Sequence, residues 1–426
     1  MRLLAVLAAA LALDLIFPLP PTVPNVDSAL YQTLARNLAA GRGFVAPDRI
    51  ALSVPDATVR PIVPSAIRTP GYPLFLALVP APVLVQRALH VLLAGAVYLL
   101  VAAVTRRPRL AMISGLILAL HLPSIAIARE VMTETLFAVV VFGVFAALAL
   151  KKEWAGVLLV SIAPLIRPIA VFLPLTIAVW KRKWLPALAF LLIGYLPSAL
   201  WIARNVLVAG APVLDCITGE NALFFRGAAV RVAATKGPFF GLTALQRQTG
   251  FYRELVRSRP ALLAEALEGT TAKTHAQRSV VYGRAGGRIL RQHPIVFAEL
   301  MVSGFVRLWF DAPWETAQAA GFDYRDARIL LLPLAVVAFV FGIVGFFALR
   351  EIDKRFAGLT LLFVVYFTIL SSGPDAEPRF TTPYAPMLAI LIAAGIERVY
   401  GIRSDQNSIR RGSEGDQSGR GAESSS

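Results

Sequence analysis

Long apolar runs, separated by short polar connectors, dominate residues 1–400 of the chain. The runs are rich in Leu, Ala and Val and do not alternate with polar residues, which favours helices over strands. Several approach the ~20 residues that a helix needs to cross a bilayer. The pattern predicts an all-α, polytopic membrane protein with about ten transmembrane helices. We expect these spans near residues 3–20, 84–104, 110–127, 134–150, 155–166, 169–180, 185–203, 329–349, 356–372 and 384–399.

Two of the expected spans meet at a proline. Arg167-Pro168 separates 155–166 from 169–180, and both pieces are short for a membrane crossing. Proline interrupts the helical hydrogen-bond ladder and disfavours a helical conformation in the residue before it. The sequence therefore predicts one broken helix or two half-helices that meet at a polar break.

A further segment, 295–310, is apolar enough to suggest another span, but it contains Glu299 and Arg307. Charged side chains are unfavourable in the hydrocarbon core of a bilayer. We therefore predict an interfacial or partly buried helix there, with Trp309 and Trp314 at the depth of the lipid headgroups.

The N-terminus begins like a secretory signal peptide, with Arg2 followed by the apolar run Leu3 to Leu13. The apolar run continues past Asp14 to Phe17, and many more apolar runs follow it. This favours an uncleaved anchor helix over a cleaved signal.

Short connectors rich in basic residues indicate the orientation, because such connectors stay in the cytoplasm. They contain Arg106, Arg107, Arg109, Lys151, Lys152, Lys181, Arg182, Lys183, Arg350, Lys354 and Arg355. Both termini are then cytoplasmic, and residues 1–403 form one polytopic domain with outer loops 21–83, 204–328 and 373–383. The polar, low-complexity residues 404–426 are expected to be a disordered cytoplasmic tail.

Composition agrees with a membrane protein, since 57% of the residues are hydrophobic, 16% are charged and the mean hydropathy is +0.66. The net charge of +16 does not indicate nucleic acid, because the basic residues lack an RNA-binding motif or interleaved aromatic residues. The single cysteine, Cys216, excludes an internal disulfide. The four histidines are scattered, so no metal site or other cofactor can be predicted from the sequence. A role for a divalent metal ion stays open.

The long outer loop 204–328 is strongly basic, and loops of this length are largely exempt from the positive-inside rule. Its basic residues include Arg226, Arg231, Arg247, Arg253, Arg257, Arg259, Lys273, Arg278, Arg284, Arg288 and Arg291. Two interpretations stay open: a solvated face near anionic membrane lipids, or a cradle for a phosphate-bearing lipid.

The first outer loop contains a candidate reactive carboxylate. Leu30, Leu34 and Leu38 recur at helical spacing and predict a short amphipathic helix, with Asp27 at its start and Tyr31 one turn later. An aspartate at this position commonly caps a helix by accepting backbone N–H donors. A carboxylate there can also act as a general base toward a hydroxyl group.

Other polar motifs are expected on the same side of the membrane. Arg68-Thr69-Pro70-Gly71-Tyr72-Pro73 predicts a tight turn that brings Arg68 and Tyr72 to the Asp27 helix. Glu130 and Glu134 are spaced to share one helical face, with Arg129 available to neutralise them. Arginines follow at three span ends, in Arg167-Pro168, Arg204-Asn205 and Glu377-Pro378-Arg379-Phe380. Each could reach lipid headgroups alone, or several together could hold one phosphate.

In their order, these motifs resemble the GT-C class of membrane glycosyltransferases, which includes lipid A aminoarabinose transferases, protein O-mannosyltransferases and rhizobial core-sugar transferases. The resemblance covers nearly all of residues 1–400 and also includes Gly41-Arg42-Gly43-Phe44 and His293-Pro294. Several members of the class carry a second acidic residue directly after the aspartate, where this chain has Ser28.

The resemblance implies an inverting transfer of a sugar from a polyprenyl-phosphate carrier to a hydroxyl of a lipid, cell-envelope glycan or protein, on the periplasmic face of the bacterial inner membrane. Asp27 is then the catalytic base. Arg379, followed by Arg68, Arg167 and Arg204, would bind the donor phosphate. Tyr31, Tyr72, Glu130 and Glu134 would position the substrates.

Two alternatives remain from the sequence. A non-catalytic transporter or flippase of polyprenyl lipids would also need basic outer loops, although it predicts repeated halves that the sequence does not display. A polymerase or ligase acting on diphosphate-linked glycans would share the arrangement of the site and differ in its donor.

Overall fold

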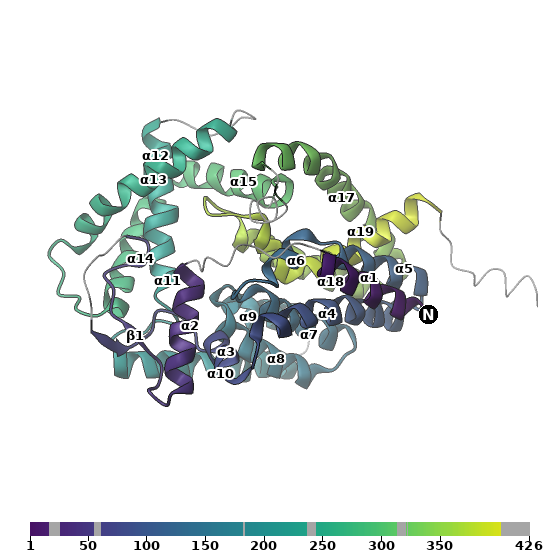
Figure 1. The fold of residues 1–426 in the computed structure, drawn as a ribbon, viewed down its shortest axis with the longest axis horizontal. Coiled ribbons are helices and arrows are strands. Elements are labelled where there is room, and N and C mark those ends of the chain that lie inside the picture. The colour runs from purple at the N-terminus through teal and green to yellow at the C-terminus, as the bar shows by residue number, and fades with distance from the viewer. Residues whose placement is uncertain are drawn as a thin grey trace, which may run out of the picture.

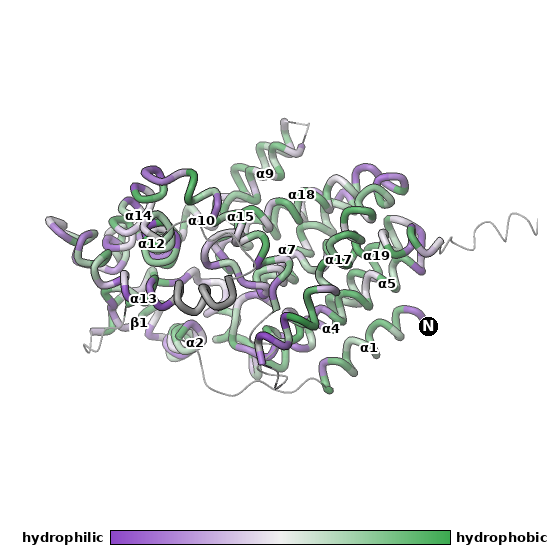
Figure 2. Tube along the Cα trace, turned by 90° about the horizontal axis from the view of Figure 1, so that it is seen from above, coloured by the Kyte–Doolittle hydropathy of each residue, from purple (hydrophilic) through white to green (hydrophobic). Residues whose placement is uncertain are grey.

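The computed structural model of the protein describes residues 1–16, 26–54, 61–181, 184–236, 244–312, 321 and 323–401. This part of the chain is mostly helical, and an apolar helical bundle adjoins a second group of helices, which lie within the segments 21–83 and 204–328 that were expected to be outer loops (Figure 1). Figure 2 shows that hydrophilic segments concentrate in that second group, whereas helices of the bundle are largely hydrophobic. The tail 404–426 and Trp314 lie outside the described residues.

Helices occupy each of the expected spans. They are α1 (Arg2–Ile16), α4 (Pro82–Thr105), α5 (Pro108–Ala119), α6 (Leu122–Ile127), α7 (Glu134–Ala149), α8 (Glu153–Ile166), η1 (Pro168–Phe172), α9 (Leu173–Trp180), α10 (Trp184–Ala209), α17 (Tyr324–Ile352), α18 (Lys354–Ser371), η3 (Pro378–Tyr384) and α19 (Ala385–Val399). By length and composition, 5 described helices can cross a membrane: α4, α10, α17, α18 and η3 with α19. The apolar helices α5, α7, α8 and η1 with α9 are shorter.

The predicted break at Arg167-Pro168 is confirmed. Helix α8 ends at Ile166, Arg167 adopts an extended backbone conformation, and the 3₁₀ helix η1 begins at Pro168. The extended conformation is the one that a following proline favours. The break places the Arg167 side chain at the end of α8 instead of along a continuous helix.

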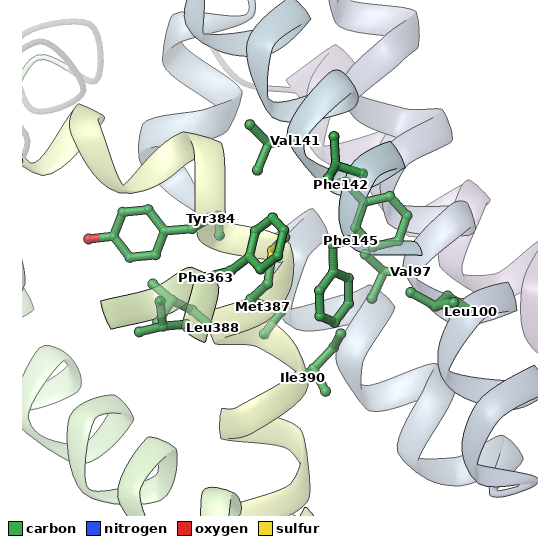
Figure 3. Close-up of a cluster of buried hydrophobic side chains, with 14 of the residues drawn as sticks. Val97, Leu100, Val141, Phe142, Phe145, Phe363, Tyr384, Met387, Leu388 and Ile390 are labelled. Atoms are coloured by element: carbon green, nitrogen blue, oxygen red, sulfur yellow. The ribbon is translucent and has the colours of Figure 1, made fainter. Parts of the chain in front are cut away.

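The core of the bundle lies where α4, α5, α7, α18 and α19 meet. Figure 3 shows Phe142 and Phe145 of α7 beside Val97 of α4, with Phe363 of α18 and Met387 of α19 packed around them. The rings of Phe145 and Phe363 have centroids 5.6 Å apart at an interplanar angle of 72°. Close packing of this kind holds helices together in an apolar solvent, where hydrophobic association contributes little.

Helix α17 contacts α19 at two glycines. Gly345 lies against the backbone of Leu391, and Gly395 lies against the backbone of Phe341, so a side chain at either glycine would collide with main chain. The rest of α17 carries exposed apolar side chains, among them Ile329, Leu334, Val340 and Phe347. A helix apolar on its exposed face fits a lipid environment.

The outer loops form the second group of helices. The long loop contains α11 (Ile217–Glu220), the π-helix η2 (Asn221–Gly227), α12 (Ala228–Lys236), α13 (Ala244–Leu267), α14 (His275–Gln292) and α15 (Pro294–Phe310). These helices enclose their own apolar cluster, which includes Phe224, Leu255, Leu262, Tyr282 and Leu300. The expected helix at 295–310 is confirmed as α15, which bends away from α14 by 101°. The two together would form a sixth candidate span or a re-entrant segment.

The first outer loop forms the predicted amphipathic helix α2 (Val26–Ala39), followed by α3 (Gly71–Leu78). Leu30 and Leu34 are buried against Phe44 and Ile67, so the apolar face of α2 rests on protein. The loop also holds two short antiparallel strands, β1 (Val45–Pro47) and β2 (Ile62–Pro64), in which Ala46 pairs with Val63. This small sheet is a minor part of a mostly helical chain, which agrees with the expected all-α class, and its β-branched residues suit an extended backbone.

The expectation for Glu130 is wrong. Helix α6 ends at Ile127 and α7 begins at Glu134, so Glu130 lies in a non-helical stretch and does not share a helical face with Glu134. Arg129 does not neutralise this pair either, since it forms an ion pair with Asp14 of α1 at 3.2 Å. Arg87 of α4 also contacts Asp14, at 2.8 Å, and the buried carboxylate thereby ties α1 to the bundle.

Candidate active site

The turn before α3 brings the first outer loop against the end of α8. Thr69 Oγ1 donates a hydrogen bond to the carbonyl of Ile166 at 3.3 Å. A side chain at Gly71 would lie 2.7 Å from the carbonyl oxygen of Leu165, so this approach requires glycine. The turn therefore fixes Arg68 next to the Arg167 break.

Arg68 forms an ion pair and hydrogen bond with Asp27. Helix α2 begins at Val26, which places Asp27 in its first turn and not before it, and the partner of its carboxylate is a guanidinium group. The Asp27 side chain keeps 41% of its exposure, whereas Arg68 keeps 11%. The positive end of the helix dipole also favours a carboxylate here. Asp27 is thus held in place and still accessible.

Two tyrosines pack beneath this ion pair. The Arg68 guanidinium lies 5.0 Å from the centroid of the Tyr31 ring, and the rings of Tyr31 and Tyr72 meet edge to face at 5.0 Å. Burial raises the pKa of the Tyr31 hydroxyl above its ordinary value, against the opposing effect of Arg68. The predicted approach of Arg68 and Tyr72 to the Asp27 helix is confirmed by these contacts.

A buried glutamine connects the tyrosines to the stretch between α6 and α7. Tyr72 donates its hydroxyl to Gln86 Oε1 at 2.6 Å, and Gln86 Nε2 donates to the carbonyl of Glu130 at 2.7 Å. Ser28 Oγ donates to the carbonyl of Val131 at 3.1 Å. Ser28 therefore anchors α2 to this stretch.

Glu130 lies within reach of the last outer loop. Burial raises the pKa of its carboxyl above the ordinary value, while the Arg379 guanidinium lowers it and Glu134 raises it further. The net direction is upward. Since these effects depend on proximity, Glu130 shares its surroundings with Arg379 and Glu134.

Glu134 and Arg167 form the second ion pair of the site. Arg167 Nη1 lies 2.7 Å from Glu134 Oε1 and donates to Thr133 Oγ1 at 2.8 Å. Glu134 is buried, whereas the Arg167 side chain keeps 22% of its exposure. Charge-assisted hydrogen bonds fix the geometry of such a pair. The Glu134 carboxylate thus orients a guanidinium group that is still partly exposed.

The last outer loop adds a third pair beside the second. Arg379 Nε lies 2.7 Å from Glu377 Oε2, and its guanidinium is 5.4 Å from the centroid of the Phe380 ring. The Arg167 guanidinium approaches the same ring at 5.9 Å. Phe380 therefore contacts two arginines that are far apart in the sequence.

Arg204 lies in a different set of contacts. It donates to the carbonyls of Ser65 at 2.6 Å and Phe44 at 3.3 Å and to Asn205 Oδ1 at 2.9 Å. Its guanidinium also lies 4.8 Å from the Trp201 ring. The other predicted site residues are joined by the contacts described above, whereas Arg204 braces the strands of the first outer loop against α10.

Sequence reasoning missed three residues that position this site. Gln86 is a buried amide within an apolar run, and a polar residue in such a run could have indicated a buried hydrogen-bonding partner from the sequence alone. Arg307 of α15 donates to the carbonyl of Gly373 at 2.7 Å, and Arg226 of η2 donates to the carbonyl of Leu370 at 3.3 Å. Arg226 also lies 3.7 Å from Asp375. The outer helices thereby hold the loop that leads to Arg379.

No protein-family model matches the chain, and the curated proteins contain no significant match to it. Within the described residues, no three His, Cys, Asp or Glu side chains gather in a way that would hold a metal ion.

Proposed function

We propose that this protein is an inverting glycosyltransferase with a GT-C-like architecture, which moves a sugar from a polyprenyl-phosphate donor to an acceptor hydroxyl. In this proposal the shorter apolar helices join the long ones to give about ten spans, as their composition allows. The protein lies in the bacterial inner membrane, with both termini in the cytoplasm and the site on the periplasmic face. The acceptor is a lipid, a cell-envelope glycan or a protein.

One observation carries the proposal: Ser28 ties the helix of the accessible Asp27–Arg68 pair to the stretch before Glu134, and Arg167, the partner of Glu134, contacts the same Phe380 ring as Arg379. A polyprenyl-phosphate donor requires cationic side chains at the membrane surface, and an acceptor hydroxyl requires a nearby base. The cluster supplies both in a protein whose surrounding helices are apolar.

In the proposed reaction, the Asp27 carboxylate accepts the proton of the acceptor hydroxyl. The acceptor oxygen forms a bond to the anomeric carbon while the bond from that carbon to the phosphate oxygen breaks. The electron pair of the breaking bond stays on the polyprenyl phosphate. Because the acceptor attacks from the face opposite the phosphate, the anomeric centre is inverted. Arg68 holds the Asp27 carboxylate in position, and partial proton removal is sufficient as the new bond forms.

Arg379 and Arg167 are suited to the departing phosphate, which gains negative charge as the bond breaks. Each is already oriented by a carboxylate and keeps about a fifth of its side chain exposed, 21% and 22% respectively. Donors that are fixed before the reaction stabilise developing charge without reorganising during it. We leave Arg204 out of the phosphate site, because three of its hydrogen bonds already go to the protein.

The test is transfer by the purified, full-length protein from a set of polyprenyl-phosphate hexoses and pentoses to a cell-envelope extract. We expect wild-type protein to release polyprenyl phosphate and Asp27→Asn to lose about 10²–10⁴-fold in rate. Both proteins should unfold at similar temperatures, because an ion pair whose carboxylate keeps 41% of its exposure contributes only about 0–1 kcal/mol.

Asp48→Asn is the matched control. Asp48 also pairs with an arginine, Arg278, at 3.0 Å, but it follows strand β1 and its partner lies on α14, and neither residue belongs to the site. This variant should retain transfer after correction for folded protein. Undiminished transfer by Asp27→Asn would remove Asp27 as the base. Movement of the lipid across vesicles without sugar transfer would favour a transporter instead.

A further inference from the structure

Helix α14 carries a stripe of exposed arginines. Arg284, Arg288 and Arg291 are exposed and recur at helical spacing, whereas Tyr282 and Ile289 on the opposite face are buried in the outer cluster. The helix contains no Asp or Glu between His275 and Gln292. In the part of the chain that the structure describes, these three arginines form no ion pair within 4.0 Å. The charge of Arg288 acts on Glu265 of α13, which already pairs with Arg231, so the stripe faces outward with much of its charge uncompensated.

The stripe leads directly into an exposed apolar face. After the bend of 101°, α15 exposes Ile295 at 74%, Val302 at 50% and Val306 at 45%. These residues follow one side of α15, while Leu300 and Leu308 on another side are buried. A row of cations beside a row of apolar side chains is the arrangement of an element that lies at a membrane surface.

The neighbouring helix α13 provides an internal comparison. It also exposes arginines, Arg253 and Arg257, but Arg257 lies 3.5 Å from Glu254, and Glu265 forms a pair with Arg231 at 2.6 Å. In its described part, α13 exposes no large apolar side chain. Mixed charge without apolar surface is typical of a solvated face. The two helices thus differ in what their exposed faces offer to a membrane.

We propose that the α14–α15 elbow docks on anionic phospholipid headgroups of the bilayer surface. Arg284, Arg288 and Arg291 would contact the headgroup phosphates, and Ile295, Val302 and Val306 would insert beside the acyl chains. Each arginine near an anionic surface contributes about 5-fold to the association constant. This surface is separate from the Asp27 cluster, so the proposal does not depend on the glycosyl transfer reaction.

The test uses full-length protein with Ile295→Cys carrying an environment-sensitive fluorophore. Cys216 is the single native cysteine and is fully buried, so the label reports on the elbow. The labelled protein, in a neutral detergent at low salt, is titrated with phosphatidylglycerol and, in parallel, with phosphatidylcholine. We expect a saturable blue shift with phosphatidylglycerol only. In nanodiscs that contain phosphatidylglycerol, doxyl lipids should quench the label.

Removing two arginines tests the stripe itself. Arg284→Gln with Arg288→Gln should weaken the phosphatidylglycerol response by about 30-fold. The control, Arg253→Gln with Arg257→Gln, removes the same charge at the same helical spacing and should weaken it less than about 3-fold. Equal losses in the two double variants, or an equal response to the two lipids, would overturn the proposal. Full competition by inorganic phosphate would also overturn it, because the stripe would then bind free anions.

Discussion

Two carboxylates in the outer loops, Asp27 and Glu220, are both held by cationic or donor side chains but in opposite settings. Glu220 is fully buried and accepts from the Leu52 N–H at 3.0 Å, from the Ser53 N–H at 2.9 Å and from Ser53 Oγ at 2.9 Å. His275 Nε2 lies 2.6 Å from Glu220 Oε1, the oxygen that also accepts from the Leu52 N–H. Asp27 pairs with Arg68 and keeps 41% of its exposure.

The difference follows from desolvation. A charged group in the interior is tolerated only when neighbouring donors replace its water, so a buried carboxylate with a full set of donors is a structural element. Burial raises the pKa of Glu220, and the hydrogen bonds from His275, Leu52 and Ser53 outweigh burial and lower it below the ordinary value. Asp27 retains lone pairs that water or a substrate can reach. Glu220 organises the outer helices, and Asp27 is available for chemistry.

The largest effect on stability should come from breaking the Glu220 cluster. Glu220→Ala would leave the buried His275 and the Ser53 donors without their acceptor, and we expect the free energy of unfolding to fall by about 3–5 kcal/mol. Reversible denaturation of the purified protein in detergent measures this change.

Asp27→Ala is the comparison for that experiment, since it also truncates one carboxylate beside a cation. It should lower the free energy of unfolding by no more than about 1 kcal/mol. If the two variants lose similar stability, the distinction between a structural and an accessible carboxylate is wrong.

The next largest effect separates two arginines that the sequence placed in one role. Arg379→Gln should reduce the rate of transfer by about 10²–10³-fold, the usual result of removing one donor to a developing anion. Arg204→Gln should leave the rate per folded molecule nearly unchanged, while losing about 1–3 kcal/mol of stability because the Ser65 and Phe44 carbonyls lose their donor. A rate loss in Arg204→Gln comparable to that in Arg379→Gln would return Arg204 to the phosphate site.

Arg204 also illustrates how far the sequence could predict this site. Apolar runs and proline breaks identified the helices, because their length and periodicity are local properties of the chain. The approach of Arg68 to the Asp27 helix followed from a turn motif close to α2, whereas their ion pair was not predicted. The contacts of Arg204 with Phe44 and Ser65 depend on how the outer loop folds back over α10, and no local pattern encodes that.

The same limit explains the errors around Glu130. Residues 128–133 have the spacing of a continuing helix, but Gln86 of α4 binds the carbonyl of Glu130 and Ser28 of α2 binds that of Val131. Carbonyls used by side chains of other helices are removed from the local helical ladder. Arg129 likewise pairs with Asp14, a residue of α1 that is far away in the sequence. Tertiary partners override local preference at these positions.

A pH experiment sharpens the comparison further. The folded-state pKa of Glu220 lies below its ordinary value of 4.5, so its stabilising contribution is complete above that pH and is lost as the pH falls through the folded-state pKa. Wild-type stability should therefore decrease in acid more steeply than that of the double variant Glu220→Gln with His275→Gln, in which both titrating partners are absent. Unfolding curves recorded between neutral pH and pH ~3 should converge toward acid. Parallel curves would contradict the assignment of the acid limb to Glu220.

The smallest effect is expected at an exposed pair in the outer helices. Arg231 donates to both oxygens of Glu265, at 2.6 and 3.0 Å, and this hydrogen bonding lowers the pKa of the carboxyl. Both side chains are substantially exposed, 40% and 58%. Water and salt therefore screen the pair, and Glu265→Gln should change the free energy of unfolding by only about 0.2–1 kcal/mol, with the difference shrinking at high salt. A loss as large as that of Glu220→Ala would show that burial is not what separates structural carboxylates from the others in this protein.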